Sequence, residues 1–394
     1  MKVKFLLKNF LYIISRTLKL IQNFILVCIR IVLFGARQRN VMPKKILVLR
    51  LASLGDFICA LPALHFLRKK YPYTKILLLS SLSMNTSVLR SKQIKQQFFF
   101  RYLRPGVINE LYLFDKNILS KANIFRKARR YIKKFNPDMS FIFLFSQERF
   151  LNVLKKMIFL RLLGVNRNLY GDLYNVGRYQ HQVLTPIHIV ASSGVTFNEK
   201  EDIIFDIYID KCTKNKIDRF FVDSKLDAKK IITIFPGGTY AFKRWPIINF
   251  VRVCKKILEK YKVNFVVVGS ENECILGTKL ADEIPDGVFN VVGKTNLMEV
   301  AEILRRSDLC VGNDSGITHL AAAVNTPCVT IFSSIYPPGI WEPWNSRSLT
   351  VKAKVDCQYC KSEFYCPIGT ECCIGRISVD MVFQRVEQVL KSSI

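Results

Sequence analysis

The stretch KKILVLRLASLGDFICALPALHFLRKK, residues 44–70, decides the fold of this chain because it joins three structural signals. A run of Ile, Leu and Val is typical of a buried strand, Gly55 lies in a segment typical of a tight loop, and the apolar positions that follow are typical of a helix. Such a strand-loop-helix unit is the building block of parallel α/β sheets. It also contains Asp56, the only Asp or Glu in the first 109 residues.

The same alternation continues along the chain and predicts two sheets with crossover helices. In the first series, strand patterns lie at 44–50, 74–81, 109–115 and 138–145, and helical patterns lie near 57–70, 119–135 and 149–163. A second series follows the less regular region 165–228, with strand patterns at 229–238, 263–270, 289–295, 308–314 and 327–333, and helical patterns near 246–261, 272–284, 296–306 and 315–324. We therefore expect two doubly wound, Rossmann-like α/β domains, at 44–210 and 225–375, and a C-terminal amphipathic helix in 376–394. Ligands of such open sheets bind at the carboxyl ends of the strands, and two such domains in sequence are expected to face a cleft.

The charge of the chain implies an anionic partner. The 394 residues include 60 Lys and Arg against 30 Asp and Glu, a formal net charge of +30. Nucleic acid, a phospholipid surface and a phosphorylated substrate would all suit this charge. We expect no nucleic-acid partner, because no helix-turn-helix, RNA-binding aromatic signature or zinc-finger spacing accompanies the charge.

The N-terminal 40 residues predict an amphipathic basic helix at a membrane. The longest uncharged run, Leu20–Ile29, has ten residues, short of the roughly 20 that cross a bilayer. On a helical wheel the polar residues gather on one side and leave a wide apolar face, a pattern typical of a helix in a membrane interface. The polar side holds Lys4, Lys8, Ser15, Arg16, Lys19, Gln22, Asn23 and Arg30. The alternative is a helix packed on the protein's own core, whereas recurring charges disfavour a cleaved secretory signal.

The motif VGNDSGITHLAAAV, residues 311–324, is the strongest local signal for a binding site. A buried strand ends at Gly312, Asp314 or Ser315 can cap the next helix, and Gly316 permits close approach to the helix start. The unpaired N–H groups of a helix N-terminus suit a diphosphate, and His319 could face the same site one turn later. The alternative is a capped helix with an ordinary histidine.

Two further loops follow predicted strands. In FPGGTYAFKRWP, residues 235–246, Gly237 and Gly238 let backbone amides reach a phosphate, Thr239 adds a hydroxyl, and Lys243 can neutralise charge on a leaving group. In VVVGSENE, residues 266–273, Glu273 follows a strand and a glycine, where an acid often accepts hydrogen bonds from ribose hydroxyls. The alternatives are an ordinary strand-to-helix loop and a solvated glutamate at a helix start.

Asp56 has two possible roles of its own. A helix N-cap is the structural one. A general base is the functional one, because the carboxylate lies where a strand passes to a helix, at the ligand-binding edge of the first predicted domain.

Together these motifs resemble the heptosyltransferases, a family of bacterial glycosyltransferases with the GT-B architecture of two Rossmann-like domains, which build the lipopolysaccharide inner core from ADP-heptose. The resemblance runs in family order from about residue 44 to residue 340. It is carried by ILVLRLASLGDFICALPALHFLRKKYP, by FPGGTYAFKRWP, by VVVGSENE and by LRRSDLCVGNDSGITHLAAAVNTPCVTIFSSIYPP.

The resemblance implies an inverting, metal-independent transfer of a sugar, expected to be heptose from ADP-heptose, onto a lipopolysaccharide core or related glycolipid. The first domain would bind the acceptor, through residues that the sequence does not identify, and the second would bind the nucleotide sugar. Asp56 would be the base, Lys243 would stabilise the departing diphosphate, Glu273 would hold the ribose and His319 would support the phosphate site. The implied donor-binding residues are Gly237, Gly238, Thr239, Lys243, Glu273, Asp314, Ser315, Gly316 and His319. The resemblance implies no cofactor and no metal, and no Asp-x-Asp pair that would hold a divalent metal is found in a suitable loop.

The implied setting is the cytoplasm, at the inner face of the inner membrane, with an anionic glycolipid acceptor and the membrane surface as partners. The alternative function is a catalytically silent GT-B protein that binds a nucleotide sugar or lipid and acts in assembly. The cysteine cluster Cys357–Cys373 leaves three interpretations open, namely structural zinc, a disulfide or redox pair, and plain thiols.

Overall fold

The computed structural model describes residues 18, 21–36, 42–50, 53–81, 105–114, 122–145, 149–171, 180–226, 229–357, 359–360, 366 and 372–392. Its contacts divide the chain into two compact units. Unit 1 holds Met1–Leu51, Pro62–Leu82 and Val107–Ile204, and unit 2 holds Ala52–Leu61, Ser83–Gly106 and Phe205–Ile394.

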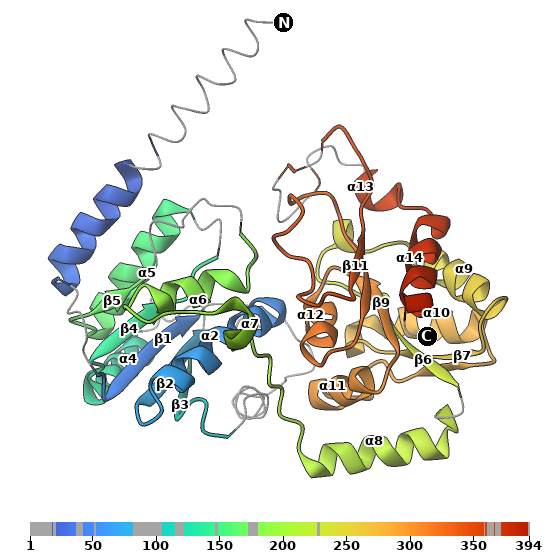
Figure 1. Cartoon of the computed structure of the whole chain (residues 1–394), viewed down its shortest axis with the longest axis horizontal. Coiled ribbons are helices and arrows are strands. Elements are labelled where there is room, and N and C mark those ends of the chain that lie inside the picture. The colour runs from blue at the N-terminus through green and yellow to red at the C-terminus, as the bar shows by residue number, and fades with distance from the viewer. Residues whose placement is uncertain are drawn as a thin grey trace, which may run out of the picture. The chain divides into compact units, whose positions relative to one another are not determined.

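Unit 1 is built on a five-stranded parallel sheet (Figure 1), as the strand patterns predict. The order β3-β2-β1-β4-β5 places the first strand in the middle, so the chain reverses direction across the sheet between β1 and β4. The strands are β1 (Lys45–Arg50), β2 (Lys75–Ser81), β3 (Glu110–Phe114), β4 (Met139–Ile142) and β5 (Leu169–Tyr170). The helices are α2 (Leu54–Lys70), α4 (Ala122–Phe135), α5 (Phe150–Leu163), α6 (Leu184–Ala191) and α7 (Glu199–Asp202).

Unit 2 repeats this arrangement on a six-stranded parallel sheet of order β11-β10-β9-β6-β7-β8. The reversal lies between β6 and β9, and at such a point the loops after the two strands diverge and leave room for a ligand. The strands are β6 (Lys230–Phe235), β7 (Val263–Val267), β8 (Val288–Asn290), β9 (Leu309–Asn313), β10 (Cys328–Ile331) and β11 (Leu349–Val351). The helices are α8 (Lys211–Asp223), α9 (Ile247–Leu258), α10 (Cys274–Glu283), α11 (Leu297–Arg305), α12 (Gly316–Ala323), α13 (Cys372–Gly375) and α14 (Val379–Ser392), with 3-10 turns η3 (Ala241–Lys243) and η4 (Glu271–Glu273).

Helices on both faces of the second sheet explain its apolar strands. Every residue of β7 and β9 is buried, as expected when a parallel sheet is covered on two sides. In Figure 1, α11 and α12 lie on one side of this sheet and α9, α10 and α14 lie on the other. Trp245 is buried in the core, and its Nε1 donates to the carbonyl oxygen of Ile377 at 2.8 Å, which fixes the chain just before α14. The two-domain Rossmann-like fold is therefore confirmed.

An N-terminal helix is present over residues 21–34, whereas residues 1–17 lie outside the described part of the chain. Leu26, Arg30 and Phe34 are buried along one side of it. Arg30 differs from the expectation, because the helical wheel placed it on the polar side, whereas its side chain is buried. Its Nη1 instead donates to the carbonyl oxygen of Gly35 at 3.2 Å, where a helix end leaves carbonyls without partners. Within the described residues, no helix has both the length and the hydropathy needed to cross a bilayer.

Candidate functional site

The predicted donor-binding loops lie at the carboxyl edge of the second sheet. The loop of residues 236–240 follows β6, the loop of 268–270 follows β7, and the loop of 314–315 follows β9. Since β6 pairs directly with both β7 and β9, three loops from distant parts of the sequence meet around one central strand. The chemistry that the motifs suggest is thus brought together by strand order.

Asn313, at the end of β9, holds two of these loops together, although its uncharged side chain did not mark it as a candidate in the sequence. Its side chain is fully buried, and Nδ2 donates to the carbonyl oxygens of Pro236 at 2.8 Å and Gly237 at 2.9 Å. Its Oδ1 accepts the backbone N–H of Trp245 at 3.0 Å. One amide therefore sets the distance between the β6 loop and the start of the α12 motif.

Lys243 and Asp314 form an ion pair in the same place. The ammonium nitrogen of Lys243 lies 2.7 Å from Oδ2 of Asp314, and the side chains are 20% and 7% exposed. Asp314 is further fixed by its backbone N–H, which donates to the carbonyl oxygen of Ile331 at 3.0 Å. A shielded ammonium with a fixed partner suits the stabilisation of a phosphate, because an ion in a partly buried position interacts more strongly than one in water.

Glu273 organises the loop after β6 as well as its own turn. Its Oε1 accepts the N–H of Gly238 at 2.8 Å, and its Oε2 accepts the N–H and hydroxyl of Ser270 at 2.7 and 2.9 Å. The backbone at Gly237 approaches so closely that a Cβ there would lie 1.8 Å from Oε1, which explains the glycine. Arg244 completes the loop by donating from Nε to the carbonyl oxygen of Gly238 at 2.6 Å, whereas Thr239 is exposed.

The N-terminus of α12 points its first amides toward this edge, and Ser315 is its N-cap. The hydroxyl of Ser315 accepts the N–H of Ile317 at 3.2 Å, as the alternative of a capped helix predicts. Gly316 is required by close packing, because a Cβ there would lie 2.7 Å from Cγ of Leu54. His319 is buried, and its Nδ1 lies 3.7 Å from the sulfur of Cys59.

Asp56 lies in the first turn of α2, within the segment Ala52–Leu61 that groups with unit 2. It is not the N-cap. It is the third residue after Ser53, and its Oδ2 accepts the backbone N–H of Ser53 at 2.8 Å and the Ser53 hydroxyl at 2.7 Å. This is the geometry by which an acid in the first turn supports a helix start. The preceding Gly55 packs on His319, since a Cβ would lie 3.0 Å from its ring, so this turn contacts α12.

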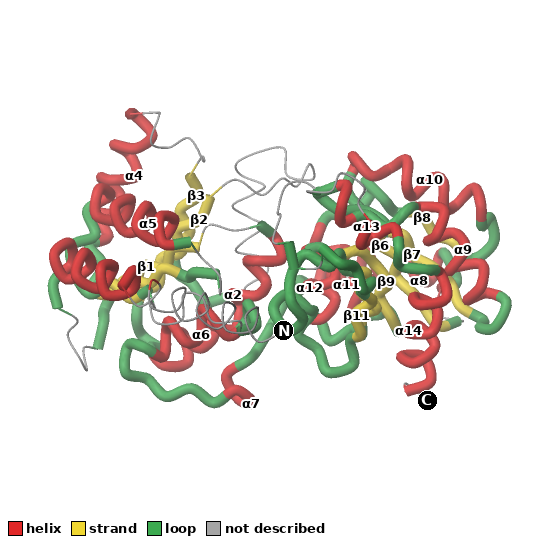
Figure 2. Tube along the Cα trace, turned by 90° about the horizontal axis from the view of Figure 1, so that it is seen from above, coloured by secondary structure: helices red, strands yellow, loops and turns green. Residues whose placement is uncertain are grey.

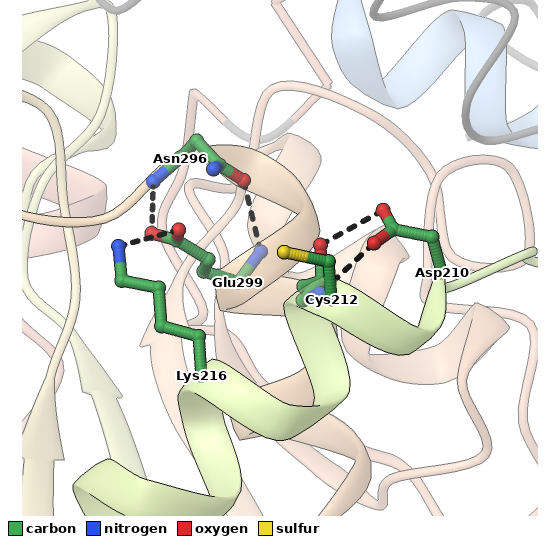
Figure 3. A pocket seen from close by; sticks show the side chains of 6 residues that line it. Asp210, Cys212, Lys216, Asn296 and Glu299 are labelled. Carbon is green, nitrogen blue, oxygen red and sulfur yellow. Dashed lines mark hydrogen bonds and ion pairs between the residues drawn. The ribbon is translucent and has the colours of Figure 1, made fainter.

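A surface pocket of about 350 Å³ between α8 and α11 contains none of the predicted site residues (Figure 3). Its polar groups serve the helix ends. Asp210 accepts the N–H of Thr213 at 2.9 Å, and Asn296 and Glu299 form a capping box at the start of α11. Lys216 pairs with Glu299 at 2.6 Å. Helix capping and ion pairing therefore account for the polar side chains that line this pocket.

Metal-ligating side chains do not converge in the part of the chain that the structure describes, which contains no group of three His, Cys, Asp or Glu residues suited to an ion. Cys357 and Cys373, at the ends of the cysteine cluster, are half-buried and buried, while residues 361–365 and 367–371 between them lie outside the described residues.

The sequence of this chain is similar to one protein family and to several of its members. A family model described as glycosyltransferase family 9 (heptosyltransferase) matches residues 170–366, half of the chain. Lipooligosaccharide heptosyltransferase 2 of Campylobacter jejuni is 22% identical over 346 residues, which cover 86% of this chain and 96% of that protein. Lipooligosaccharide heptosyltransferase 2 of Haemophilus influenzae is 30% identical over 118 residues, 28% of this chain and 34% of that protein.

Solved structures show the same fold over nearly the whole chain. A glycosyl transferase family 9 protein from Veillonella parvula superposes with a TM-score of 0.66 at 20% identity, covering 89% of this chain and 97% of that one. The E. coli ADP-heptose lipopolysaccharide heptosyltransferase II superposes with a TM-score of 0.62 at 17% identity, covering 89% of this chain and 99% of that one.

Proposed function

Because this chain belongs to glycosyltransferase family 9, we propose that it transfers heptose from ADP-heptose to a lipopolysaccharide core or related glycolipid, with inversion and without a metal. The heptose donor and the glycolipid acceptor are inferred from the names of its relatives. The observation that carries the proposal is the shielded Lys243–Asp314 pair beside the start of α12, within the region that the family model matches.

The donor diphosphate is assigned to the edge of the second sheet. The amides at the start of α12 offer partial positive charge, and Lys243 adds a full one. Gly237, Thr239 and Ser315 supply further backbone or hydroxyl groups, whereas the N–H of Gly238 is held by Glu273. As the bond to the sugar breaks, negative charge grows on the diphosphate, and these donors stabilise it where a divalent ion does so in other transferases.

Glu273 is proposed to accept hydrogen bonds from the ribose hydroxyls. Each of its oxygens already accepts from the protein, but a carboxylate oxygen has two lone-pair positions and can accept again. In this role Glu273 couples the nucleotide to the β6 loop, because the same carboxylate holds the N–H of Gly238. His319 supports the α12 start from within the helix.

Asp56 is proposed as the general base. The acceptor hydroxyl loses its proton to the carboxylate as its oxygen attacks the anomeric carbon from the face opposite the departing ADP, and the configuration inverts. The two hydrogen bonds from Ser53 orient the carboxylate. An anionic lipid acceptor is drawn by the net charge of +30, and we place the protein in the cytoplasm, at the inner face of the inner membrane.

A nucleotide panel tests the proposal. Thermal unfolding is followed with ADP, UDP, GDP and ADP-heptose, and transfer to a heptose-free lipopolysaccharide core is then measured with and without EDTA. We expect stabilisation by ADP and ADP-heptose but not by UDP or GDP, and transfer that EDTA does not reduce. Absence of stabilisation by every nucleotide would refute the donor assignment, and ADP-heptose binding without turnover would support the silent alternative instead.

A further inference from the structure

Unit 1 exposes apolar side chains on two of its helices. On the helix of residues 21–34, Phe24, Ile25 and Val32 are exposed, with Phe24 at 69% and Val32 at 83%. Their spacing places them on one face, opposite the side on which Leu26 is buried. On α5, Leu151, Ile158 and Leu162 are exposed at a spacing of seven and four residues, again on one face. We call these six residues the apolar surface: Phe24, Ile25, Val32, Leu151, Ile158 and Leu162.

The two helices are neighbours, since residues 21–34 and α5 run side by side in the two perpendicular views (Figures 1 and 2). The helix of residues 21–34 is held in place on unit 1 by Leu26 and Phe34, which are 0% and 2% exposed. Its outward side chains are therefore presented on a fixed support. Exposed apolar groups on two neighbouring helices are typical of an interaction site in a folded protein.

The positive charges of α4, the helix next to α5, indicate what kind of partner the apolar surface binds. Helix α4 packs against α5, and a Cβ at Gly164, which ends α5, would lie 2.7 Å from the Lys133 side chain of α4. The exposed residues of α4 include Arg126, Lys127 and Arg130, and neither α4 nor α5 contains an Asp or Glu. Cations next to apolar groups complement the anionic headgroups and acyl chains of a bilayer, and this charge gives no advantage toward a neutral apolar partner.

We propose that the apolar surface and the cations of α4 form a docking face for an anionic phospholipid bilayer. This rests on the proposed function only in naming the membrane as a partner, and it specifies which residues enter the lipid. Phe24, Ile25 and Val32 insert with Leu151, Ile158 and Leu162 into the boundary between headgroups and acyl chains. Arg126, Lys127 and Arg130 contact the headgroups.

Vesicle binding by the full-length protein tests this face without donor or acceptor, so its result is independent of whether the protein transfers heptose. The probes are phosphatidylcholine vesicles with and without phosphatidylglycerol, and the readout is the partition coefficient from co-sedimentation. The apolar variants are Phe24→Ser with Val32→Ser, and Leu151→Ser with Ile158→Ser. The matched control is Val222→Ser with Ile275→Ser, which replaces exposed apolar residues of unit 2.

Each apolar variant is expected to lower partitioning onto phosphatidylglycerol vesicles by about tenfold or more, because two inserting side chains are lost. The control variant should bind as the unaltered protein does. The triple change Arg126→Gln, Lys127→Gln and Arg130→Gln should weaken binding to phosphatidylglycerol vesicles and reduce its salt dependence. The triple change Lys211→Gln, Lys214→Gln and Arg219→Gln, on exposed residues of α8, should not.

Two outcomes would overturn the proposal. If both apolar variants partition as the unaltered protein does, the apolar surface does not meet lipid. If the α4 and α8 triple variants lose binding equally, net charge alone accounts for the attraction, and no face of unit 1 is selected. Because every altered side chain is exposed, thermal unfolding of the variants is expected to match that of the unaltered protein.

Discussion

The ion pair with Asp314 keeps the ammonium of Lys243 in a fixed position, although that ammonium already has a partner. With its partner 2.7 Å away, the ammonium is held in one position before the proposed diphosphate would bind. Fixing a charged donor in advance avoids reorganisation during the reaction, which is the main source of electrostatic catalysis. Asp314 in this arrangement positions Lys243.

Replacing either member of this pair should separate the two roles. Lys243→Gln is expected to lower kcat/KM by about 10² to 10³, the range for loss of one donor at a developing charge. Asp314→Asn keeps the size of the side chain but frees the ammonium, and we expect a loss of about tenfold, or about 1.4 kcal/mol. Steady-state kinetics with ADP-heptose measures both. A tighter ADP complex in Asp314→Asn would show that the carboxylate opposes the diphosphate.

Asp56→Asn tests the base directly. The amide can still accept a hydrogen bond from Ser53, so helix α2 should remain intact, while proton removal is lost. We expect kcat to fall by about 10² to 10⁴, the range for a general base, with ADP affinity unchanged. The matched control is Ser53→Ala, which removes the hydroxyl that donates to Asp56 and should cost about 1 kcal/mol of stability, with kcat within a fewfold of the original. Equal kcat losses in both variants would argue that Asp56 acts only as a helix support.

Several of the proposed site residues stand out in the sequence because they carry a distinctive chemical type at a strand end. Asp56 is conspicuous as an isolated acid, and Lys243 follows a glycine pair. Asn313 was missed because it bears no charge, and its partners Pro236 and Gly237 are more than seventy residues away. Only the pairing of β6 with β9 brings Asn313 close to these partners, and this pairing cannot be predicted from the local sequence.

At the scale of elements, long periodic segments were predicted well and short ones were not. Eight of the nine expected strand patterns contain a strand, because their apolar runs match the burial of a covered sheet. The pattern at 289–295 only overlaps β8, which begins at Val288 and is half-buried. Strands β5 and β11, of two and three residues, lie at sheet edges and are too short to show a period. Helix α8 was hidden by its charges, although Thr213, Ile217 and Phe221 recur every four residues and are buried.

Asp202 at the end of α7 gives a prediction for pH dependence. Burial opposes ionisation of this carboxyl, but the N–H of Asn198 and the ammonium of Lys69, each 2.8 Å away, outweigh burial and lower its pKa. A carboxylate with a lowered pKa stabilises the fold above its unfolded pKa of about 3.9, and this contribution is lost as the pH falls through the folded value.

Asp202→Asn is therefore expected to cost about 1.5 to 3 kcal/mol of unfolding free energy at neutral pH, as for a hydrogen bond to a charged group. The difference from the original protein should shrink as the pH falls below about 4. Urea unfolding of both proteins across the acid range measures it. Asp282→Asn, on the exposed surface of α10, is the control and should show no such difference. A gap between the two proteins that stays constant with pH would contradict the ionic origin.

At the scale of the whole molecule, the division into two units predicts where a nucleotide acts. All proposed donor groups belong to unit 2, so ADP at about 100 times its Kd should stabilise that unit by about 2.7 kcal/mol. Hydrogen exchange resolves the effect by segment. We expect slower exchange in 230–240 and 313–323 with ADP, and unchanged exchange in β1 to β4. Equal protection of both sheets would mean that the nucleotide is held by more of the chain than unit 2.

The packing of the N-terminal helix against unit 1 affects how this protein is best produced. Shortening the chain to begin near Met42 is the obvious route to a better-behaved preparation, since it removes the exposed side chains of residues 21–34. It would also remove Leu26, Arg30 and Phe34, and the part of unit 1 that they cover would face water instead. The shortened chain would thus lose one exposed apolar surface and gain another. The substitutions Phe24→Ser and Val32→Ser instead keep the helix packed on unit 1 and suit crystallisation better.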